Sequence, residues 1–540
     1  MIPGPRKPQP EKANQISFFL FLLASLLFLS LSTPVGALTE VELSPVPSPD
    51  GAVFLIVDGL SAPFVYPELT PRALDGNPLE KALLTTLPEI AGESARVLDI
   101  RAPQTFTEGG HSVLVTGNRK ADSELVSFKD ASLFDAAHKN GYLCLGVMER
   151  GDSWAICAEQ DAILRDKNNS LKNLKISLEE YEHPPKTVKV PPELIKLMKE
   201  AGAQAPTYTA SKETRERYSG YNRWGIDTAC KIVEYMAEKL PDQKYILTVN
   251  VGAVDLSGHY RKNYGYIDCI EKLDTDLLPL YELCKKHNLV FILTSDHGMA
   301  FPTPDSRGGH QAEKYAVSDE AQMLPLLVQA PGIKVGVLEG KYGQEDIAPT
   351  ILSLLNIPER PRFSEGEVIF EKDYANLKVI MREKDTIKLL VRENEAGRRR
   401  KGSGSKSKIG IEESESENVL NSWKELASTR VDNEFLFLGL EPDQSYKIVG
   451  AEGASLPENE FFLKGDLVLD FTQMLPAASQ TLEKKEAEFE AFETFNDSTS
   501  PFSLPQSLGS KSNFKRFAGY ILIGLINFGG LVLIARILKE

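Results

Sequence analysis

Apolar runs of five to seven residues recur through the first two thirds of the chain. They are rich in aliphatic and β-branched residues and show little alternation with polar ones, which is the pattern of parallel strands buried on both faces. A helical pattern at 133–141, ended by a glycine, precedes one of them. The runs cover residues 52–57, 143–147, 245–251 and 289–294. Strands that alternate with helices predict a doubly wound α/β sheet, with helices on both faces, over residues 50–362.

Two further segments of this predicted domain are less regular. The apolar run 323–328 contains Pro325, which lacks a backbone donor, so we expect an edge strand there. Residues 150–220 are polar and contain two Pro-Pro pairs. We expect this stretch to form a cap or lid segment.

After residue 362 the pattern changes to short β-rich runs. They cover residues 387–391, 435–438, 446–449 and 467–471. A small β-sandwich-like domain over residues 363–475 is the predicted structure. Its insertion at 396–418 is first basic, then Gly/Ser-rich and finally acidic. This composition favours a disordered, solvated loop over a contact with an anionic lipid or polymer.

Both ends of the chain contain apolar stretches. Residues 1–37 combine basic residues, an apolar run and small residues up to Ala37, which predicts a cleaved signal peptide; an uncleaved anchor is the alternative. Residues 476–514 are acidic and then Ser/Pro-rich, as in a linker. Residues 515–537 include an uncharged stretch long enough for a transmembrane helix. The prediction is therefore a membrane-anchored protein with the bulk of the chain extracytoplasmic.

Charge and cysteine content exclude some classes of protein. The formal net charge of -15 argues against a general nucleic-acid-binding surface. The five cysteines have no C-x-x-C spacing, and their odd number gives no disulfide framework.

Aspartates and histidines follow the ends of three predicted strands. A further histidine lies in the loop after the last of these strands. Each alone would be read as a helix cap or as an ordinary surface or core histidine. Together they place six such groups at the carboxyl edge of one sheet, where α/β proteins bind ligands. Carboxylate and imidazole ligands favour Zn²⁺ or Mn²⁺ over Ca²⁺. The residues are Asp58, Asp255, His259, Asp296, His297 and His310.

Thr107 lies where a loop is expected to turn into a helix whose first turn contains Gly109 and Gly110. Free backbone N–H groups at a helix start favour an anionic phosphoryl or sulfuryl group. The alternative is that Thr107 is only an N-cap and that the glycines loosen the turn.

The ordered set of these residues resembles the alkaline phosphatase superfamily. Residues 107–111, Thr-Glu-Gly-Gly-His, resemble the Ser-Glu-x-Gly-His motif of cofactor-independent phosphoglycerate mutases and the Thr-x-x-x-His of nucleotide pyrophosphatase/phosphodiesterases. Residues 346–358 resemble the helix that closes the catalytic domain in this superfamily. The resemblance covers roughly residues 50–362.

The resemblance implies an alkaline-phosphatase-like fold and a site for two divalent metal ions, Zn or Mn. One ion would be held by Asp58, Thr107, Asp296 and His297. The other would be held by Asp255, His259 and His310. Thr107 would be the nucleophile, and a phospho-threonine intermediate would form on it.

We expect a metal-dependent phosphatase or phosphodiesterase that acts on a small phosphorylated substrate. The larger mutases carry a big inserted domain, rich in substrate-binding arginines, where this chain has only a short interval. The predicted location outside the cytoplasm also suits a glycolytic enzyme poorly. A mutase-like phosphotransferase and a non-catalytic cell-surface binding protein are the alternatives. Sulfatases need a Cys or Ser that is converted to formylglycine, which Thr107 does not provide.

Overall fold

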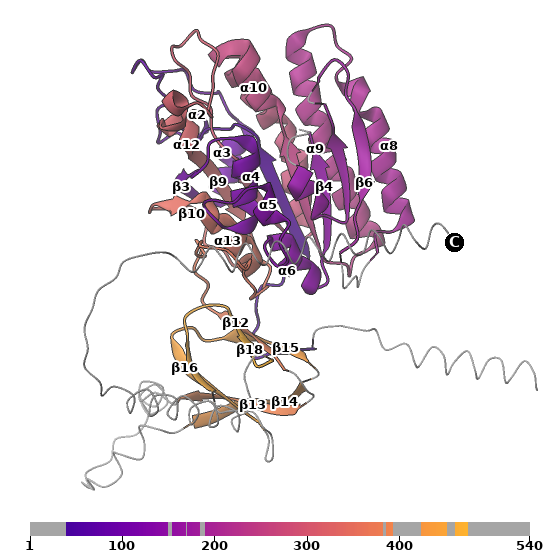
Figure 1. Ribbon diagram of the computed structural model, residues 1–540, viewed down its shortest axis with the longest axis vertical. Coiled ribbons are helices and arrows are strands. Elements are labelled where there is room, and N and C mark those ends of the chain that lie inside the picture. The colour runs from indigo at the N-terminus through magenta and orange to yellow at the C-terminus, as the bar shows by residue number, and fades with distance from the viewer. Residues whose placement is uncertain are drawn as a thin grey trace, which may run out of the picture. The chain divides into compact units, whose positions relative to one another are not determined.

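The computed structural model describes residues 39–149, 154–168, 170–183, 189–381, 385–392, 423–431, 433–450 and 459–472. These residues form an α/β region and a β-rich region (Figure 1). The α/β region contains the strands that were predicted from the four apolar runs.

The α/β region is built on a ten-stranded sheet. Its strands in spatial order are β10 (Gly336–Leu338), β3 (Ala95–Arg101), β9 (Met323–Gln329), β8 (Leu289–Thr294), β2 (Gly51–Val57), β7 (Tyr245–Val251), β4 (Leu143–Met148), β5 (Ala162–Asp166) and β6 (Ile176–Glu180), and β11 (Tyr342–Gly343) pairs with β3. The five strands from β8 to β5 are parallel, whereas β9 and β6 pair antiparallel with their neighbours. The predicted α/β class is confirmed, with a mixed sheet.

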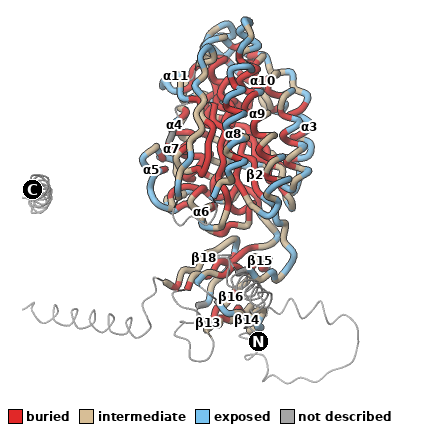
Figure 2. Tube along the Cα trace, turned by 90° about the vertical axis from the view of Figure 1, so that its right-hand side faces the viewer, coloured by how far each residue is buried: buried red, intermediate tan, exposed pale blue. Residues whose placement is uncertain are grey.

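Helices cover both faces of this sheet (Figure 1). Successive side chains of a strand point to opposite faces, so in β2 Val53 and Leu55 enter one apolar core while Phe54 enters the other. The first core also contains residues of α2 (Ala62–Val65), α3 (Thr86–Gly92), α8 (Pro192–Tyr208), α9 (Thr214–Lys239) and α10 (Ala253–Lys286). The second contains residues of α4 (Thr107–Thr116), α5 (Ser123–Val126), α6 (Leu133–Lys139), α7 (Trp154–Ala158) and α13 (Ile347–Leu354). Figure 2 shows the resulting buried layer along β2. The described residues also form α11 (Glu313–Ala316), α12 (Asp319–Gln322) and η1 (Gln344–Asp346).

Strand β9 lies inside the sheet, between β3 and β8, so the expectation of an edge strand is wrong. Pro325 is accommodated because the pairing of β3 with β9 shifts register between Val97 and Ile100, opposite the proline. The pairing with β8 begins only at Leu327. A proline inside a sheet is tolerated at such an irregularity, where no ladder hydrogen bond is required of it.

The segment predicted as a cap or lid contributes β5, β6 and α8, together with the start of α9. Strand β6 pairs with β5 over its whole length, from Ala162 opposite Glu180 to Asp166 opposite Ile176. These elements extend the main sheet and one of its helical layers.

The β-rich region consists of two four-stranded sheets. One has the order β1 (Thr39–Glu42), β15 (Glu434–Leu440), β12 (Ala375–Ile380), β18 (Leu467–Asp470), and the other β14 (Trp423–Val431), β13 (Asp385–Arg392), β16 (Gln444–Gly450), β17 (Asn459–Leu463). Their common core includes Leu377, Ile387, Phe435 and Tyr446. Strand β1 precedes the α/β region in the chain and pairs in parallel with β15, which no sequence pattern had indicated.

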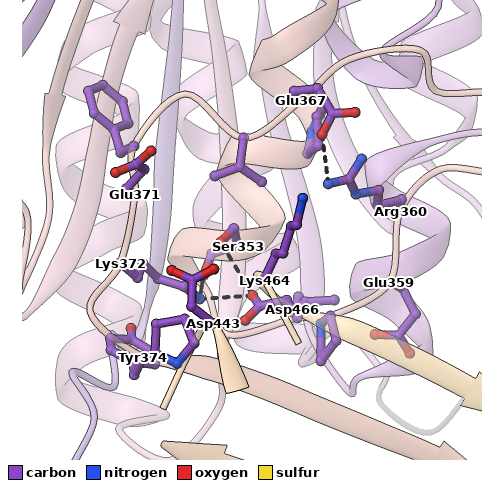
Figure 3. A pocket seen from close by; sticks show the side chains of 17 residues that line it. Ser353, Glu359, Arg360, Glu367, Glu371, Lys372, Tyr374, Asp443, Lys464 and Asp466 are labelled. Atoms are coloured by element: carbon purple, nitrogen blue, oxygen red, sulfur yellow. Dashed lines mark hydrogen bonds and ion pairs between the residues drawn. The ribbon is translucent and has the colours of Figure 1, made fainter. Parts of the chain in front are cut away.

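A pocket of about 400 Å³ lies between the end of α13, the segment that follows it and the turns that precede β16 and β18 (Figure 3). Within it, Lys372 Nζ lies 2.8 Å from Asp466 Oδ2 and donates to the backbone carbonyl of Ser353. The pocket contains none of the seven predicted site residues.

The prediction of a membrane-anchored, extracytoplasmic protein is corrected by the structure. No helix in the described part of the chain is both long and apolar enough to cross a bilayer. The longest described helices, α9 with 26 residues and α10 with 34, carry charged residues throughout. The predicted signal peptide (1–37), insertion (396–418), linker (476–514) and transmembrane helix (515–537) lie outside the described residues.

Candidate metal centre

The carboxyl ends of β2, β7 and β8 meet at one edge of the sheet, which we call the carboxyl edge. The three strands are in parallel register, with Val57 beside Val251 and Ile56 beside Thr294. The polar groups that follow the strands are therefore brought together, and α4 and the loop after β8 add the others. All seven predicted site residues lie in this one place: Asp58, Thr107, Asp255, His259, Asp296, His297 and His310.

Four of these residues form a first cluster around the imidazole of His297. Its Nε2 lies 3.2 Å from Thr107 Oγ1. It also lies 3.6 Å from an oxygen of Asp58 and 3.4 Å from one of Asp296. Both carboxylates and the imidazole are fully buried. The cluster therefore joins a hydroxyl, two carboxylates and an imidazole nitrogen.

The other three residues form a second cluster. The Nε2 atoms of His259 and His310 are 3.0 Å apart. Oδ1 of Asp255 lies 3.3 Å from the first and 3.4 Å from the second. His310 also stacks on His297, with ring centroids 3.6 Å apart, so the two clusters are adjacent.

Backbone carbonyls orient all three histidines in the same sense. Nδ1 of His259 faces the carbonyl of Gly308 at 3.3 Å, that of His297 faces Gly298 at 3.0 Å, and that of His310 faces Thr105 at 2.7 Å. Because a carbonyl oxygen only accepts, each Nδ1 is assigned as the protonated nitrogen. In the neutral rings the Nε2 lone pairs then point into the clusters. A hydrogen bond from Nδ1–H to a backbone carbonyl is usual for a histidine that binds a metal through Nε2.

The donor atoms fit divalent cations. Lone pairs of Nε2 and carboxylate oxygens converge within 3.0–3.6 Å of one another, an arrangement that repels unless a cation lies among them. At this edge two sets of residues have ligand atoms within 4.8 Å of one another, and His297 belongs to both: Asp58, Asp296 and His297, and Asp255, His297 and His310. Carboxylate and imidazole donors are common ligands of divalent metal ions.

Burial shifts the titration of Asp296 and His310 towards their neutral forms. It raises the pKa of the Asp296 carboxyl, while the charge of His111 and a hydrogen bond from the Gly59 N–H act in the opposite direction. Burial and the neighbouring His297 together lower the pKa of His310 to about 3. A buried carboxylate without a cation is costly. A bound divalent ion would remove that cost.

Thr107 is the first residue of α4, and the N-cap position is occupied by Phe106. The reading of Thr107 as only an N-cap is therefore wrong. The glycines that follow allow close packing. A Cβ on Gly110 would lie 2.2 Å from the carbonyl oxygen of Asp296. The absence of that side chain brings the start of α4 against the end of β8.

Several residues that hold the backbone next to the site are not marked by any pattern in the sequence. Gln344 Nε2 donates to the backbone carbonyls of Ser295 and Asp296 at 3.2 and 2.7 Å. Tyr266 Oη donates to the carbonyl of Gly59 and accepts from the N–H of Ser61. They hold the strand ends that carry the ligands. His111 is buried, and its Nδ1 is 3.9 Å from Asp296 Oδ2, so it lies behind the first cluster.

A pocket of about 540 Å³ opens beside both clusters. Its lining includes Thr107, His259, His310 and also Glu108 and Tyr315, and it contains no Lys or Arg among the described residues.

The arginines between residues 150 and 223 that the structure describes contact residues outside the two clusters. Arg165 pairs with Glu179, Arg215 with Asp268 and Arg223 with Asp276. Arg217 donates to the Thr214 hydroxyl. Arg150 lies outside the described residues.

Comparison with known proteins supports the resemblance that the motifs predicted. Residues 220–359 match the family model described as "Metalloenzyme superfamily". A 2,3-bisphosphoglycerate-independent phosphoglycerate mutase from Campylobacter jejuni subsp. doylei is 30% identical over 128 residues, 24% of this chain and 24% of that protein. The mutase from Aliarcobacter butzleri is 33% identical over 112 residues, 21% of each chain. The chain thus matches only about a quarter of the length of these curated relatives.

Solved structures that are similar to this chain include a phosphatase and a phosphonate hydrolase. Wild-type alkaline phosphatase PafA has 14% identity and a TM-score of 0.43, with 60% of this chain and 99% of that chain covered. The phosphonate monoester hydrolase SpPMH from Silicibacter pomeroyi has 13% identity and a TM-score of 0.38, with 83% and 95% covered. At these scores the likeness carries no argument about function. The predicted resemblance to the alkaline phosphatase superfamily is confirmed by the family match, which spans Asp255, His259, Asp296, His297 and His310.

Proposed function

We propose that this protein is a metal-dependent phosphoryl-ester hydrolase with Thr107 as its nucleophile. The observation that carries the proposal is the convergence of three Nε2 atoms, three carboxylates and one threonine hydroxyl at the carboxyl edge. Thr107 Oγ1 lies 3.2 Å from His297 Nε2, at the start of a ten-residue helix and beside an open pocket.

Two divalent cations, Zn²⁺ or Mn²⁺, fit the two clusters. Asp58, Thr107, Asp296 and His297 would hold one, and Asp255, His259 and His310 the other. When bound, the cations would favour loss of the Thr107 hydroxyl proton and offset the negative charge of the phosphoryl group.

The chain's own groups then have defined tasks. Thr107 Oγ releases its proton to solvent and attacks phosphorus, a Thr–O–P bond forms, and the ester P–O bond breaks to release an alcohol that takes a proton from water. The backbone N–H groups of the first turn of α4 have no intrahelical partners and bind phosphoryl oxygens. Water then cleaves the phospho-threonine, releases phosphate and restores the hydroxyl. Gly110 and Gln344 keep the helix start and the strand end in place.

Hydrolysis is favoured over the mutase reaction by the pocket lining. A phosphoglycerate carries a carboxylate besides its phosphate, and such a group is normally bound by a cation. The described pocket supplies no Lys or Arg for it. A mutase-type phosphotransferase remains the second candidate, because the curated relatives carry that name.

The test is hydrolysis of p-nitrophenyl phosphate and of bis(p-nitrophenyl) phosphate by the full chain with added Zn²⁺ or Mn²⁺. Thr107→Ala should lower kcat/KM by on the order of 10³ or more. Thr107→Ser keeps the hydroxyl and should retain measurable activity. Acid quenching with ³²P-labelled substrate should leave the label on Thr107.

Two results would count against the proposal. Unchanged activity of Thr107→Ala would eliminate the nucleophile. Interconversion of 2- and 3-phosphoglycerate without release of phosphate would favour the second candidate.

A further inference from the structure

A second group of metal-type side chains lies at the opposite edge of the sheet, where the parallel strands begin; we call it the amino edge. His138 is in the last turn of α6, Cys144 is near the start of β4, and Asp161 directly precedes β5. One ligand atom of each lies within 4.8 Å of the others. None of these residues belongs to the proposed catalytic machinery.

The contacts within this group converge on one carboxylate. Asp161 Oδ2 accepts a hydrogen bond from the backbone N–H of Cys144 at 2.9 Å and lies 3.1 Å from Nε2 of His138. Cys144 and Asp161 are buried, and the His138 side chain is only 15% exposed. Thiol, imidazole and carboxylate therefore share one small, largely enclosed space.

A second imidazole lies against the first. The rings of His138 and His183 are stacked, with centroids 4.5 Å apart and an interplanar angle of 16°. Nε2 of His183 is shielded from solvent and has no hydrogen-bond partner among the described residues. A hydrogen bond between His138 and Asp161 would explain two of the four side chains. It does not involve the nearby thiol or Nε2 of the second imidazole.

We propose that His138, Cys144 and Asp161 bind one divalent transition-metal ion of the zinc class, with His183 or a water molecule as the fourth ligand. Four ligands that combine sulfur, nitrogen and oxygen donors are typical of a tetrahedral zinc site. On binding, the thiol proton leaves to solvent, and the neutral His138 ring coordinates through Nε2 with its proton on Nδ1. The ion joins α6, β4 and the start of β5, so its role is structural.

Sulfur makes this site distinguishable from the proposed catalytic centre, whose seven residues include no cysteine. Cobalt(II) bound to a thiolate gives a charge-transfer band in the near ultraviolet, which oxygen and nitrogen ligands do not give. The full chain titrated with Co²⁺ should therefore develop this band. It should be absent in Cys144→Ser and unchanged in Thr107→Ala.

Cys284 provides a matched control, because it is also buried but lies among apolar residues of α10. Cys284→Ser should keep the band. If Cys144→Ser fails to fold by circular dichroism, His138→Gln replaces it, since this helix-end side chain is partly exposed. His138→Gln should weaken Co²⁺ binding at the band by at least about tenfold, because loss of even an outer-shell partner costs 10- to 100-fold.

Full Co²⁺ loading without a charge-transfer band would overturn the proposal and leave the group as a hydrogen-bonded cluster only. A band that persists in Cys144→Ser, or that disappears in Cys284→Ser, would place the sulfur ligand elsewhere and would also overturn it. Neither result depends on whether the protein hydrolyses phosphoesters.

Discussion

The two edges of the main sheet carry the same kinds of side chain in different surroundings. At the carboxyl edge, histidines and aspartates lie beside a threonine hydroxyl, a helix start and a pocket of about 540 Å³. At the amino edge, His138 and Asp161 lie beside a buried thiol and a second imidazole. The presence of histidine and aspartate alone therefore does not tell a catalytic site from a structural one. The strand end at which a residue lies does, because helix starts and loops gather at the carboxyl edge of a parallel sheet.

Replacing one aspartate by asparagine at each edge should give the largest difference in activity between two variants. Asp58→Asn removes a carboxylate of the first cluster, and we expect phosphoesterase activity to fall by on the order of 10³, as for loss of a group that acts as a unit with the nucleophile. Asp161→Asn should change activity by less than about threefold and lower the free energy of unfolding by about 1–3 kcal/mol, because a buried hydrogen-bond acceptor is weakened. Activity assays and denaturant unfolding measure both. Equal activity losses would erase the distinction between the edges.

Close packing at the carboxyl edge predicts a smaller effect. Gly110→Ala would place a Cβ 2.2 Å from the carbonyl oxygen of Asp296, and so would push α4 away from β8. A displacement of about 1 Å at a catalytic group costs about 100-fold in rate, and that loss is expected in kcat. Gly92→Ala is the control, because a Cβ there meets no atom within 4 Å. A Gly110→Ala enzyme as active as Gly92→Ala would show that this contact does not position Thr107.

Two glutamines that each donate to two backbone carbonyls sharpen the comparison further. Gln344 holds the carbonyls of Ser295 and Asp296, while Gln243 holds those of Gly141 and Lys244 near the amino edge. Replacement of either by Met should destabilise the protein by about 1–3 kcal/mol, because the carbonyls lose their donors. Only Gln344→Met should also lower activity, by about tenfold or less. An activity loss in Gln243→Met of the same size would mean that the effect is general destabilisation.

The sequence located the strand ends at the carboxyl edge because buried parallel strands are continuous apolar runs, and their ends are marked by the first polar residue. Asp58 and Asp296 were found in this way. Strand β9 was misplaced because a proline in a short run resembles an edge strand, and the register shift in β3 that accommodates Pro325 has no local signal.

Other features depend on contacts that no spacing reveals. Gln344 acts from a 3₁₀ turn after the short strand β11, and it meets Asp296 only in the folded chain. The group at the amino edge is spread from His138 to His183 without a metal-binding motif. The prediction of a membrane anchor rested on the apolar composition of the chain ends. Among the described residues, the long helices contain many charged residues and do not support a membrane anchor.

The parallel pairing of β1 with β15, from Thr39 beside Phe435 to Glu42 beside Leu438, has a consequence for the order of folding. During synthesis, β1 leaves the ribosome before any of the α/β region, but its partner is made last but three among the described strands. The α/β region can therefore form its local contacts while β1 is still an unpaired strand. Such a distant pairing closes slowly and late. The final step in assembling this chain is thus expected to be the return of its earliest described strand to one of its latest.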